Sequence, residues 1–381
     1  MDTSRKKILC WAGWYRCSQS EYSAIFIKKH LDVISKFADL HCFNIQHKKG
    51  LFWYNNFQLN ESFGKITIYQ IPSFFPLKHL GYFLIPFIEG IKCKKQFKKI
   101  DIFHLHVSYP FAVFTYLLEL LNIKKWILSE HWSGYTFKDN SFNKLNSLLK
   151  FLLTKRLNRF QKISVISNYL KVEMQKRFHF SDEKIIIIPN VLKVPEFIPE
   201  KKLNSNKFKL LTISNLVNYP KNISFLIKMI SELSKEYPDI ILNVYGDGKD
   251  REKLMELAEK LGSLNKNIFF KGKIDNDKIS DVYFNHHAFI LLSLFETFSI
   301  VTAEAILHGL PVIVTKCGGP EEFVNEKNGI LVPINDEEST KKAILHIYQN
   351  YSRYNPKTVQ STMLSNYSEE SISQKFQSIY S

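Results

Sequence analysis

The segment from Ser293 to Pro320 reads SLFETFSIVTAEAILHGLPVIVTKCGGP, and it alternates between short apolar runs and polar turns. A buried strand is expected directly before it at residues 288–292, and another within it at residues 312–315. Between the two strands, residues 297–299 are expected to open a helix. A strand, a helix and a second strand in this order indicate a βαβ unit of a parallel sheet.

Glu296 and Glu304 flank the expected start of this helix, with Glu304 about two turns along it. Backbone N–H groups at a helix N-terminus are unpaired and carry the positive end of the helix dipole, so they can hold a phosphate. A carboxylate at Glu304 can accept two hydrogen bonds from a vicinal diol such as ribose. Gly318 and Gly319 let the backbone approach a ligand, because neither has a Cβ atom. Since open α/β sheets bind ligands outside the carboxyl ends of their strands, the segment predicts a site for a phosphorylated sugar compound.

The same alternation continues in both directions along the chain. In the first half, strands are expected at residues 8–12, 39–45, 65–71, 102–106, 126–129, 162–166 and 185–188, with helices such as 23–37 and 111–121. In the second half, strands are expected at residues 209–213, 240–245, 268–271, 288–292, 312–315 and 329–332, and helices at 222–237, 250–261, 277–285, 300–308 and 337–350. Strands that alternate with helical patterns predict an α/β fold with parallel sheets.

The chain of 381 residues is longer than a single hydrophobic core usually supports, which is about 250–300 residues. Pro195, Pro199 and the polar run at residues 200–207 show no periodicity and mark a linker. We therefore expect a first domain over residues 1–198 and a second over residues 206–364.

Positive charge is concentrated in the first half of the chain. The net charge is +16 overall; residues 1–200 contain 30 Lys and Arg against 15 Asp and Glu, and residues 201–381 contain 22 against 21. A one-sided positive field attracts anionic partners such as nucleic acid, an acidic membrane or phosphorylated substrates. A lysine-rich surface that serves only solubility would give the same imbalance, so both interpretations stay open.

Cysteine usage and hydropathy bear on the cellular setting. The five cysteines are odd in number and contain no C-x-x-C pair, which favours a reducing cytoplasm over a disulfide framework or a zinc site. We find no signal peptide and no apolar stretch of about 18 residues, so a cytoplasmic chain without a membrane span is expected.

Residues 142–160 form an amphipathic pattern with a basic face, which either packs on the sheet or lies on anionic lipid.

The carboxylates Glu296 and Glu304, the run at residues 309–312 (GLPV) and the pair Gly318-Gly319 together resemble the family-four GT-B glycosyltransferases. The resemblance extends over nearly the whole chain. It implies a GT-B fold, in which two Rossmann-like domains face each other across a cleft and a C-terminal helix, here about residues 365–381, packs back on the first domain. It also implies that Glu296 contacts hydroxyls of the donor sugar and that Glu304 contacts the ribose of the nucleotide.

Other segments of the second half match the same family. The resemblance implies donor contacts from Ser214, Asn215, Lys221, Gly246, Gly248, Lys271, Gly272, Glu296, Thr297, Phe298, Ser299 and Glu304. Lys221 would neutralise the diphosphate leaving group as a point charge. Many relatives carry an arginine where this chain has Asn215. Of the family's usual arginine and lysine, this chain therefore has only the lysine, Lys221.

Two segments of the first half also match. His131 follows an expected strand and resembles the family's histidine that faces the cleft, which implies a contact with the donor sugar or its phosphate. Tyr15 and Arg16 lie in the loop that faces the acceptor in this family and are the predicted acceptor contacts. This chain has Ala24-Ile25-Phe26 where relatives often have a glycine pair or Gly-Ile-Phe, so the loop departs from the family pattern.

The reaction implied by the resemblance is a retaining transfer of a hexose-type sugar, without a bound metal, from a nucleotide-sugar to a saccharide or lipid-linked saccharide in cell-surface polysaccharide synthesis. His131, Glu296 and Lys221 are the predicted catalytic residues, and no carboxylate is placed to act as a covalent nucleophile. The donor is a substrate, so no cofactor is expected; a UDP-sugar is expected rather than a GDP-sugar. His104 and His106 form an H-x-H pair, but no third ligand is evident and no metal site is expected.

Two other classes of protein stay open. A nucleotide-sugar epimerase on the same fold would bind the donor and need no acceptor. A non-enzymatic protein would bind a nucleotide or nucleic acid. Nucleic acid is not an expected partner, because no binding module is recognisable and the basic residues are dispersed rather than clustered with aromatics. The basic half instead suggests a hypothesis of peripheral association with the inner face of the cytoplasmic membrane, where a lipid-linked acceptor would lie.

Overall fold

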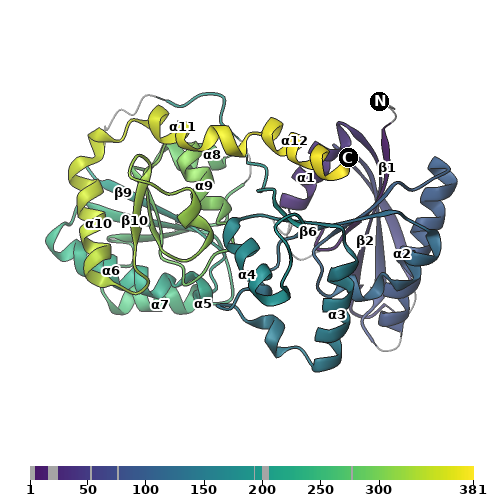
Figure 1. Cartoon of the computed structure of the whole chain (residues 1–381). Coiled ribbons are helices and arrows are strands. Elements are labelled where there is room, and N and C mark those ends of the chain that lie inside the picture. Colours follow the sequence, from purple (N-terminus) through teal and green to yellow (C-terminus); the bar gives the residue numbers. More distant parts are fainter. Residues whose placement is uncertain are drawn as a thin grey trace. The chain divides into compact units, whose positions relative to one another are not determined.

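The computed structural model describes residues 5–15, 25–51, 54–74, 77–192, 194–199, 206–275 and 278–381. They form two compact units, one of Met1–Val191 with Glu369–Ser381 and one of Leu192–Ser368. Each unit contains one sheet of mainly parallel strands packed against helices (Figure 1). The predicted α/β fold with parallel sheets is therefore confirmed.

The first unit contains an eight-stranded sheet with the order β3-β4-β2-β1-β5-β6-β7-β8. Its strands are β1 (Lys6–Ala12), β2 (Ala38–Lys48), β3 (Asn55–Glu61), β4 (Gly64–Pro72), β5 (Ile102–His106), β6 (Lys125–Glu130), β7 (Lys162–Val165) and β8 (Ile185–Ile187). Within the described residues, only β3 and β4 pair in the antiparallel direction. The central strand β5 is buried along its whole length, as expected for a parallel strand that is covered on both faces.

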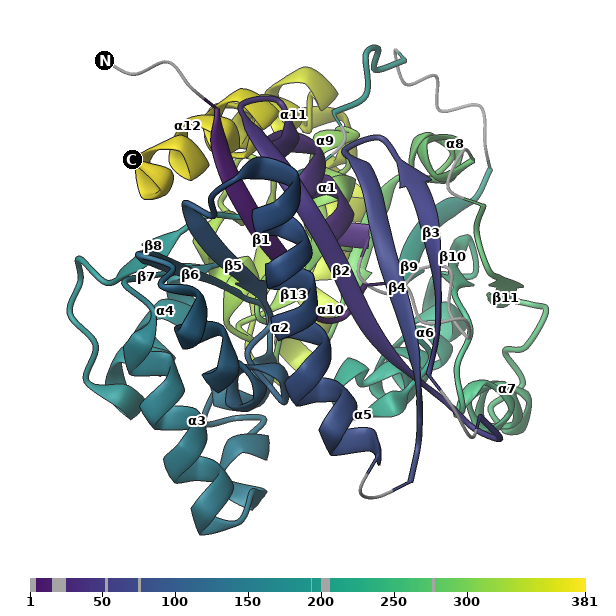
Figure 2. The same cartoon turned by 90° about the vertical axis from the view of Figure 1, so that its right-hand side faces the viewer.

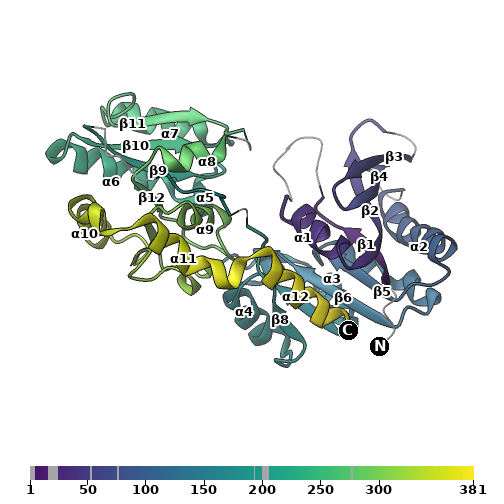
Figure 3. The ribbon, with the colours of Figure 1, turned by 90° about the horizontal axis from the view of Figure 1, so that it is seen from above.

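Five helices and several short 3-10 segments belong to the described part of this unit. They are α1 (Ile25–Ser35), α2 (Leu77–Phe97), α3 (Ser147–Arg159), α4 (Asn168–Phe178) and α12 (Glu369–Tyr380), with 3-10 turns at Phe111–Phe114, Tyr116–Leu121, Ser133–Tyr135 and Ser141–Lys144. Figure 2 shows α2 lying across β1 and β2. The C-terminal helix α12 lies beside α1 (Figure 3) and buries Ile372, Phe376 and Ile379 in the core that Ile27 and Leu31 also enter.

The second unit contains six parallel strands in the order β11-β10-β9-β12-β13-β14. The strands are β9 (Phe208–Ile213), β10 (Ile240–Tyr245), β11 (Ile268–Gly272), β12 (Ala288–Leu291), β13 (Val312–Thr315) and β14 (Gly329–Val332). The helices are α5 (Asn218–Lys221), α6 (Ile223–Glu236), α7 (Arg251–Lys260), α8 (Ile279–Phe284), α9 (Ile300–Leu307), α10 (Glu337–Asn350) and α11 (Pro356–Tyr367). The strand order reverses between β9 and β12, and such a reversal is where open α/β sheets bind ligands.

Most expected strands are present with nearly the expected ends, but two features differ from the prediction. The strand β3 was not expected, because its sequence NNFQLNE is polar and mostly exposed, as an edge strand can be. The helix expected at residues 111–121 is wrong: two 3-10 segments meet at Thr115, whose hydroxyl donates to the carbonyl of Ala112 at 2.7 Å. The two units divide between Val191 and Leu192, ahead of the proline and polar run.

Candidate functional site

The predicted donor-binding residues of the second unit gather at the carboxyl edge of its sheet. Ser214 follows β9, Gly246 follows β10, and Gly272 ends β11. Glu296 and Gly318 lie in the loops that follow β12 and β13. Because parallel strands end at a common edge, these loops meet around the reversal between β9 and β12.

Lys221 and Glu296 form an ion pair at this edge. The Nζ atom of Lys221 donates to Oε1 of Glu296 at 2.6 Å, and the hydroxyl of Ser293 donates to the same oxygen at 2.8 Å. The side chains of Lys221 and Glu296 are 24% and 11% exposed, so water screens the pair only in part. No described residue donates to the second oxygen, Oε2. One cation and one carboxylate oxygen therefore lie side by side, a combination that suits an anionic ligand carrying hydroxyl groups.

One backbone and one side-chain hydrogen bond fix the position of this pair. The backbone N–H of Leu294 donates to the carbonyl of Pro220 at 2.9 Å, and the side-chain amide of Asn222 donates to the carbonyl of Leu292 at 3.1 Å. These bonds join the end of α5 and the residue before α6 to the loop after β12. The two segments that carry Lys221 and Glu296 are consequently hydrogen-bonded to each other.

The helix that carries Glu304 begins at Ile300, as the expected range of residues 300–308 predicts. Residues 297–299 form the turn before α9, and Ser299 is its N-cap residue at a left-handed φ of 69°. The Ser299 and Thr302 hydroxyls share a hydrogen bond of 2.8 Å, so Ser299 is already engaged at the cap. Thr297 is partly exposed in the same turn.

Phe298 and Gly319 determine how this turn packs. The ring of Phe298 is buried against Phe323 and Tyr367, so Phe298 can reach a ligand only through its backbone. A Cβ atom on Gly319 would lie 2.5 Å from the Cα atom of Phe298, which leaves room for glycine alone. The N–H of Gly319 also donates to the carbonyl of Glu296 at 2.9 Å. The glycine loop after β13 thus supports the turn that carries Glu296.

Glu304 lies half-buried on α9, about one turn after the first residue of the helix, Ile300. The hydroxyl of Tyr283 donates to Oε2 of Glu304 at 3.4 Å and to the carbonyl of Val301 at 3.2 Å. Burial, with Glu304 as the neighbouring charge, raises the pKa of Tyr283 well above its ordinary value. Tyr283 therefore stays a neutral donor and orients the carboxylate.

The loops after β9 and β10 are packed against each other by glycine. A Cβ atom on Gly246, at φ +123°, would overlap the carbonyl of Ser214, and one on Gly248 would lie 2.6 Å from Oδ1 of Asn215. The hydroxyl of Ser214 is buried and has no hydrogen-bond partner among the described residues. Asn215 is exposed beside it. A buried hydroxyl without a partner at a ligand-binding edge is available to a ligand.

Lys271 and Gly272 lie at the end of β11, toward the border of the sheet. The Lys271 side chain is exposed, with its Nζ atom 5.0 Å from the ring centre of Phe269. The carbonyl of Gly272 accepts a hydrogen bond from the N–H of Gly246 at 2.8 Å. This bond links the end of β11 to the loop after β10.

The predicted residues of the first unit have a different environment. Both ring nitrogens of His131, directly after β6, are buried without a hydrogen-bond partner among the described residues. Burial lowers the pKa of His131 well below its ordinary value, so the ring is neutral near pH 7. Tyr15 is buried with its ring edge-on to Phe63, and Arg16 lies outside the described residues. The roles of these residues toward donor and acceptor stay predictions.

Two polar partners in this site were not predicted from the sequence. Ser293 lies only three residues before Glu296, and Tyr283 lies on α8, outside every motif. Only the fold brings them to the two carboxylates, and neither residue type carries a signal by itself.

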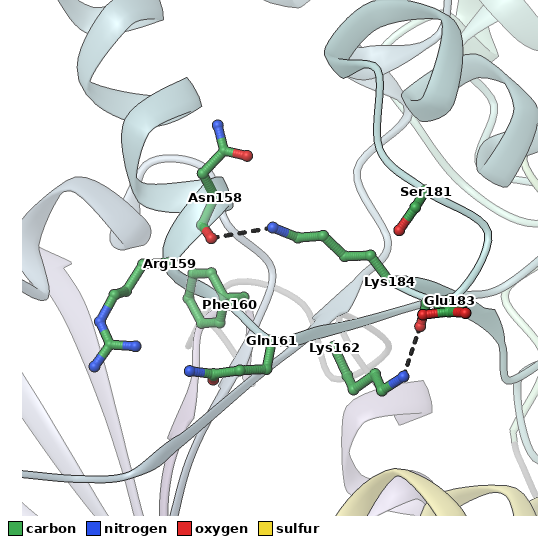
Figure 4. Close-up of a pocket in the computed structure, with 8 residues that line it drawn as sticks. All are labelled: Asn158, Arg159, Phe160, Gln161, Lys162, Ser181, Glu183 and Lys184. Carbon is green, nitrogen blue, oxygen red and sulfur yellow. Dashed lines mark hydrogen bonds between the residues drawn. The ribbon is translucent and has the colours of Figure 1, made fainter.

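A separate pocket of about 460 Å³ lies in the first unit, where Asn158, Arg159, Phe160, Gln161, Lys162, Ser181, Glu183 and Lys184 line it (Figure 4). Lys162 begins β7 and Lys184 precedes β8, so the pocket lies at the amino ends of these strands. Lys162 donates to the carbonyl of Glu183 and Lys184 to that of Asn158, at 2.7 and 3.1 Å. The pocket contains none of the predicted site residues.

Comparison with sequence families matches both parts of the chain. Residues 193–360 match the family described as "Glycosyl transferases group 1", and residues 52–194 match "Glycosyltransferase Family 4". The first match contains the whole carboxyl edge described above.

Individual relatives agree with these family matches. The chain is 24% identical, over 83% of its length, to a phosphatidylinositol N-acetylglucosaminyltransferase subunit of Arabidopsis thaliana, and 27% identical over 68% to the gpi3 subunit of that enzyme from Schizosaccharomyces pombe. The aligned regions span 70% and 54% of those two proteins. Among solved structures, Anabaena HepE in complex with UDP and glucose has a TM-score of 0.74 at 16% identity, with 98% of this chain and 99% of HepE covered.

Proposed function

Because the chain belongs to the family-four GT-B glycosyltransferases, we propose that it transfers a sugar from a nucleotide-sugar, bound at the carboxyl edge of the second sheet, to an acceptor. The observation that carries this proposal is the pairing of Lys221 with Glu296 beside the start of α9. That pairing combines a cation for phosphate, a carboxylate for sugar hydroxyls and a helix N-terminus.

The nucleotide-sugar would use these groups in order along its length. Glu304, oriented by Tyr283, would accept hydrogen bonds from the ribose hydroxyls. The turn before α9 and Lys221 would hold the diphosphate, because both present positive charge. Oε2 of Glu296 would accept a hydrogen bond from a hydroxyl of the sugar. The buried hydroxyl of Ser214 is a further donor at the same edge.

The transfer would depend on stabilising the leaving diphosphate. Negative charge grows on the bridging oxygen as the bond to the anomeric carbon breaks, and preorganised positive groups lower the energy of that state more than that of the ground state. Lys221 and the helix start supply this charge without a metal, and His131 is the predicted contribution of the first unit. We propose retention of anomeric configuration, with the acceptor attacking from the face that the leaving group departs from and no covalent intermediate.

A UDP-hexose is the proposed donor. HepE, which shares the fold, has been crystallised with UDP and glucose, and the named activity of the Arabidopsis relative is N-acetylglucosaminyl transfer. Glucose and N-acetylglucosamine are both hexose-type sugars, and UDP is the nucleotide bound to HepE. No cofactor enters this scheme, because the nucleotide-sugar is consumed as a substrate.

The proposed acceptor is a saccharide on a lipid at an anionic membrane, in keeping with the lipid named in both curated relatives. Residues 1–200 contain 30 basic against 15 acidic side chains, which would attract such a surface. On α3, Leu153 and Leu157 are buried while Leu148 and Phe151 are 68% and 63% exposed. Apolar side chains exposed on a basic unit suit insertion among lipid head groups.

Two further observations, one on α3 and one on α2, bear on the proposed membrane attachment. Arg156, which lies within the amphipathic segment predicted at residues 142–160, is buried and pairs with Glu119, so it is not part of an exposed basic face. On α2, exposed apolar residues recur on one helical face at Leu80, Leu84, Ile88 and Ile91. In the described part of the chain no helix is long and apolar enough to cross a bilayer. We therefore propose peripheral attachment at the cytoplasmic face of the membrane, in the synthesis of a cell-surface polysaccharide.

A screen of nucleotide-sugars by thermal stabilisation tests the donor, since a ligand that binds only the folded state raises the melting temperature. The stabilising compound is then incubated with the protein, with and without lipid-linked saccharides. Sugar transfer that depends on the acceptor supports the proposal. Conversion of the donor alone to its epimer would instead identify an epimerase, and stabilisation by no nucleotide-sugar would contradict the donor site.

A further inference from the structure

Three histidines from separate elements meet inside the first unit. His30 lies on α1, His106 ends β5, and His131 follows β6. They are 1%, 0% and 7% exposed, and one ring nitrogen from each lies within 4.8 Å of the other two. The strand order of this sheet reverses between β1 and β5, so the cluster lies at the edge where such sheets bind ligands.

The ring nitrogens of this cluster lack hydrogen-bond partners. Among the described residues, both nitrogens of His106, both of His131 and Nδ1 of His30 are buried without one. A buried polar atom without a partner costs about 1–3 kcal/mol, so a group of five in one place is unusual for a structural cluster. These atoms therefore indicate a binding site, in which a metal ion would contact one nitrogen of each ring and so three of the five.

The hydrogen bond of His30 defines its tautomer. Its Nε2 atom lies 2.9 Å from the carbonyl oxygen of Pro189. A carbonyl only accepts, so Nε2 carries the proton and Nδ1 presents a lone pair to the cluster. Metal-binding histidines commonly donate their other N–H to a backbone carbonyl in this way.

The three rings are buried, and burial favours neutral imidazole, which is the form that binds metal.

The neighbouring His104 shows what a structural buried histidine looks like in this fold. Its Nδ1 atom is 2.6 Å from the hydroxyl of Tyr380, and its Nε2 atom is 2.9 Å from the hydroxyl of Ser129. The H-x-H pair therefore divides into a fully bonded ring at His104 and an unbonded ring at His106. Of the H-x-H pair only His106 belongs to the cluster, and its other two members, His30 and His131, come from elements that are remote from it in the chain.

We propose that His30, His106 and His131 bind a divalent transition-metal ion, with Zn²⁺ as the ion that suits three imidazole ligands. Zn–N bonds of about 2.0–2.1 Å put tetrahedral ligand atoms roughly 3.4 Å apart, so small rotations of the rings would close the site. The buried carboxylate of Glu130 is already bonded to Ser108 and to the N–H groups of His131 and Trp132. The fourth position is thus left to water or to an anionic oxygen.

This site goes beyond the proposed transfer and does not depend on it. Its ligands belong to the first unit, whereas the Lys221–Glu296 pair belongs to the second. A metal on one nitrogen of His131 leaves the other nitrogen as an N–H donor, which is compatible with the role predicted for that residue.

The test is metal binding by the full chain, freed of any affinity tag and stripped with EDTA. Zn²⁺ is titrated against a competing chelator dye, and Co²⁺ is added separately as a spectroscopic probe. We expect one equivalent of Zn²⁺ per chain, a raised melting temperature that EDTA reverses, and the visible absorption of four-coordinate Co²⁺.

Variants of the ligands locate the ion. His106→Asn and His131→Asn should each weaken Zn²⁺ binding by on the order of 100-fold, while His346→Asn, an exposed histidine on α10, should bind as wild type does. Circular dichroism of the metal-free variants checks that they fold, and the wild-type titration decides the matter if they do not. Absence of stoichiometric Zn²⁺ binding by the wild type, or folded variants that bind Zn²⁺ as tightly as wild type, would overturn the proposal.

Discussion

Lys221 lies with its Nζ atom 2.6 Å from Oε1 of Glu296, although 75 residues separate the two in the chain. The pair joins the end of α5 to the loop after β12, and it combines the cation proposed to hold the diphosphate with the carboxylate proposed to bind the sugar. Substitution of either residue therefore tests a shared element of the site.

Lys221→Ala should lower kcat with the nucleotide-sugar by about 10²–10³, because one preorganised positive group near the leaving diphosphate is lost. The rate is measured at saturating donor, and the fold is checked by thermal melting. Lys235→Ala is the matched control, since Lys235 forms an ion pair of the same 2.6 Å length with Glu232 on an exposed helix surface. A wild-type rate in Lys221→Ala would rule out its phosphate role.

Glu296→Gln should reduce turnover but leave the affinity for UDP alone equal or higher. The amide keeps the shape of the side chain, while the lost negative charge removes a competitor of the phosphates for Lys221. Calorimetry with UDP and with the nucleotide-sugar separates the two effects. Weaker UDP binding in the variant would argue against the assignment of Glu296 to the sugar.

Glu304→Gln should weaken nucleotide-sugar binding by about 1.5–3 kcal/mol, because the ribose hydroxyls lose a charged acceptor. A change of 1.4 kcal/mol corresponds to about tenfold in Kd, which calorimetry resolves easily. Glu256→Gln on the exposed side of α7 serves as the control. Unchanged affinity in Glu304→Gln would remove the ribose assignment.

Gly319→Ala should destabilise the second unit by about 1–3 kcal/mol and abolish detectable donor binding, because the new Cβ atom would meet the backbone of Phe298 and displace the turn before α9. Gly262→Ala places a Cβ atom in open space at φ +67°, so it measures the cost of a left-handed alanine without a steric clash. Denaturant unfolding and thermal shift with the donor measure both effects. Intact donor binding in Gly319→Ala would show that the packing of this loop is unimportant to the site.

The wild-type protein should bind anionic liposomes at low salt and lose that binding as salt rises, since its basic half is attracted to negative lipid. The double variant Leu148→Ser, Phe151→Ser should bind at least about tenfold more weakly, because two exposed apolar side chains no longer insert. Leu261→Ser, an exposed leucine of the second unit, is the control. If the wild-type protein does not bind anionic liposomes at low salt, the membrane hypothesis is wrong.

The strands and most helices could be predicted because local patterns determine them. Continuous apolar runs such as β12 and β13 are buried on both faces and leave little ambiguity. The polar strand β3 has no such pattern, and it forms only because β4 offers it an edge to pair with. The 3-10 turns around Thr115 depend on a side-chain hydrogen bond that composition does not reveal.

The site could be predicted only in part. The motif residues fall at the carboxyl edge because strand ends are visible in the sequence, but the contacts between them depend on three-dimensional packing. Nothing local indicates that Lys221 reaches Glu296, that Tyr283 reaches Glu304, or that His30 joins His106. Such pairs link residues far apart in the chain, and they require the fold.

The most direct measurement of the central claim is a crystal structure of the protein with a stabilising nucleotide-sugar. The account predicts a phosphate oxygen within hydrogen-bonding distance of Lys221 and of the backbone before Ile300, with the ribose against Glu304 and the sugar against Glu296. A nucleotide-sugar bound away from the carboxyl ends of β9 and β12 would contradict it.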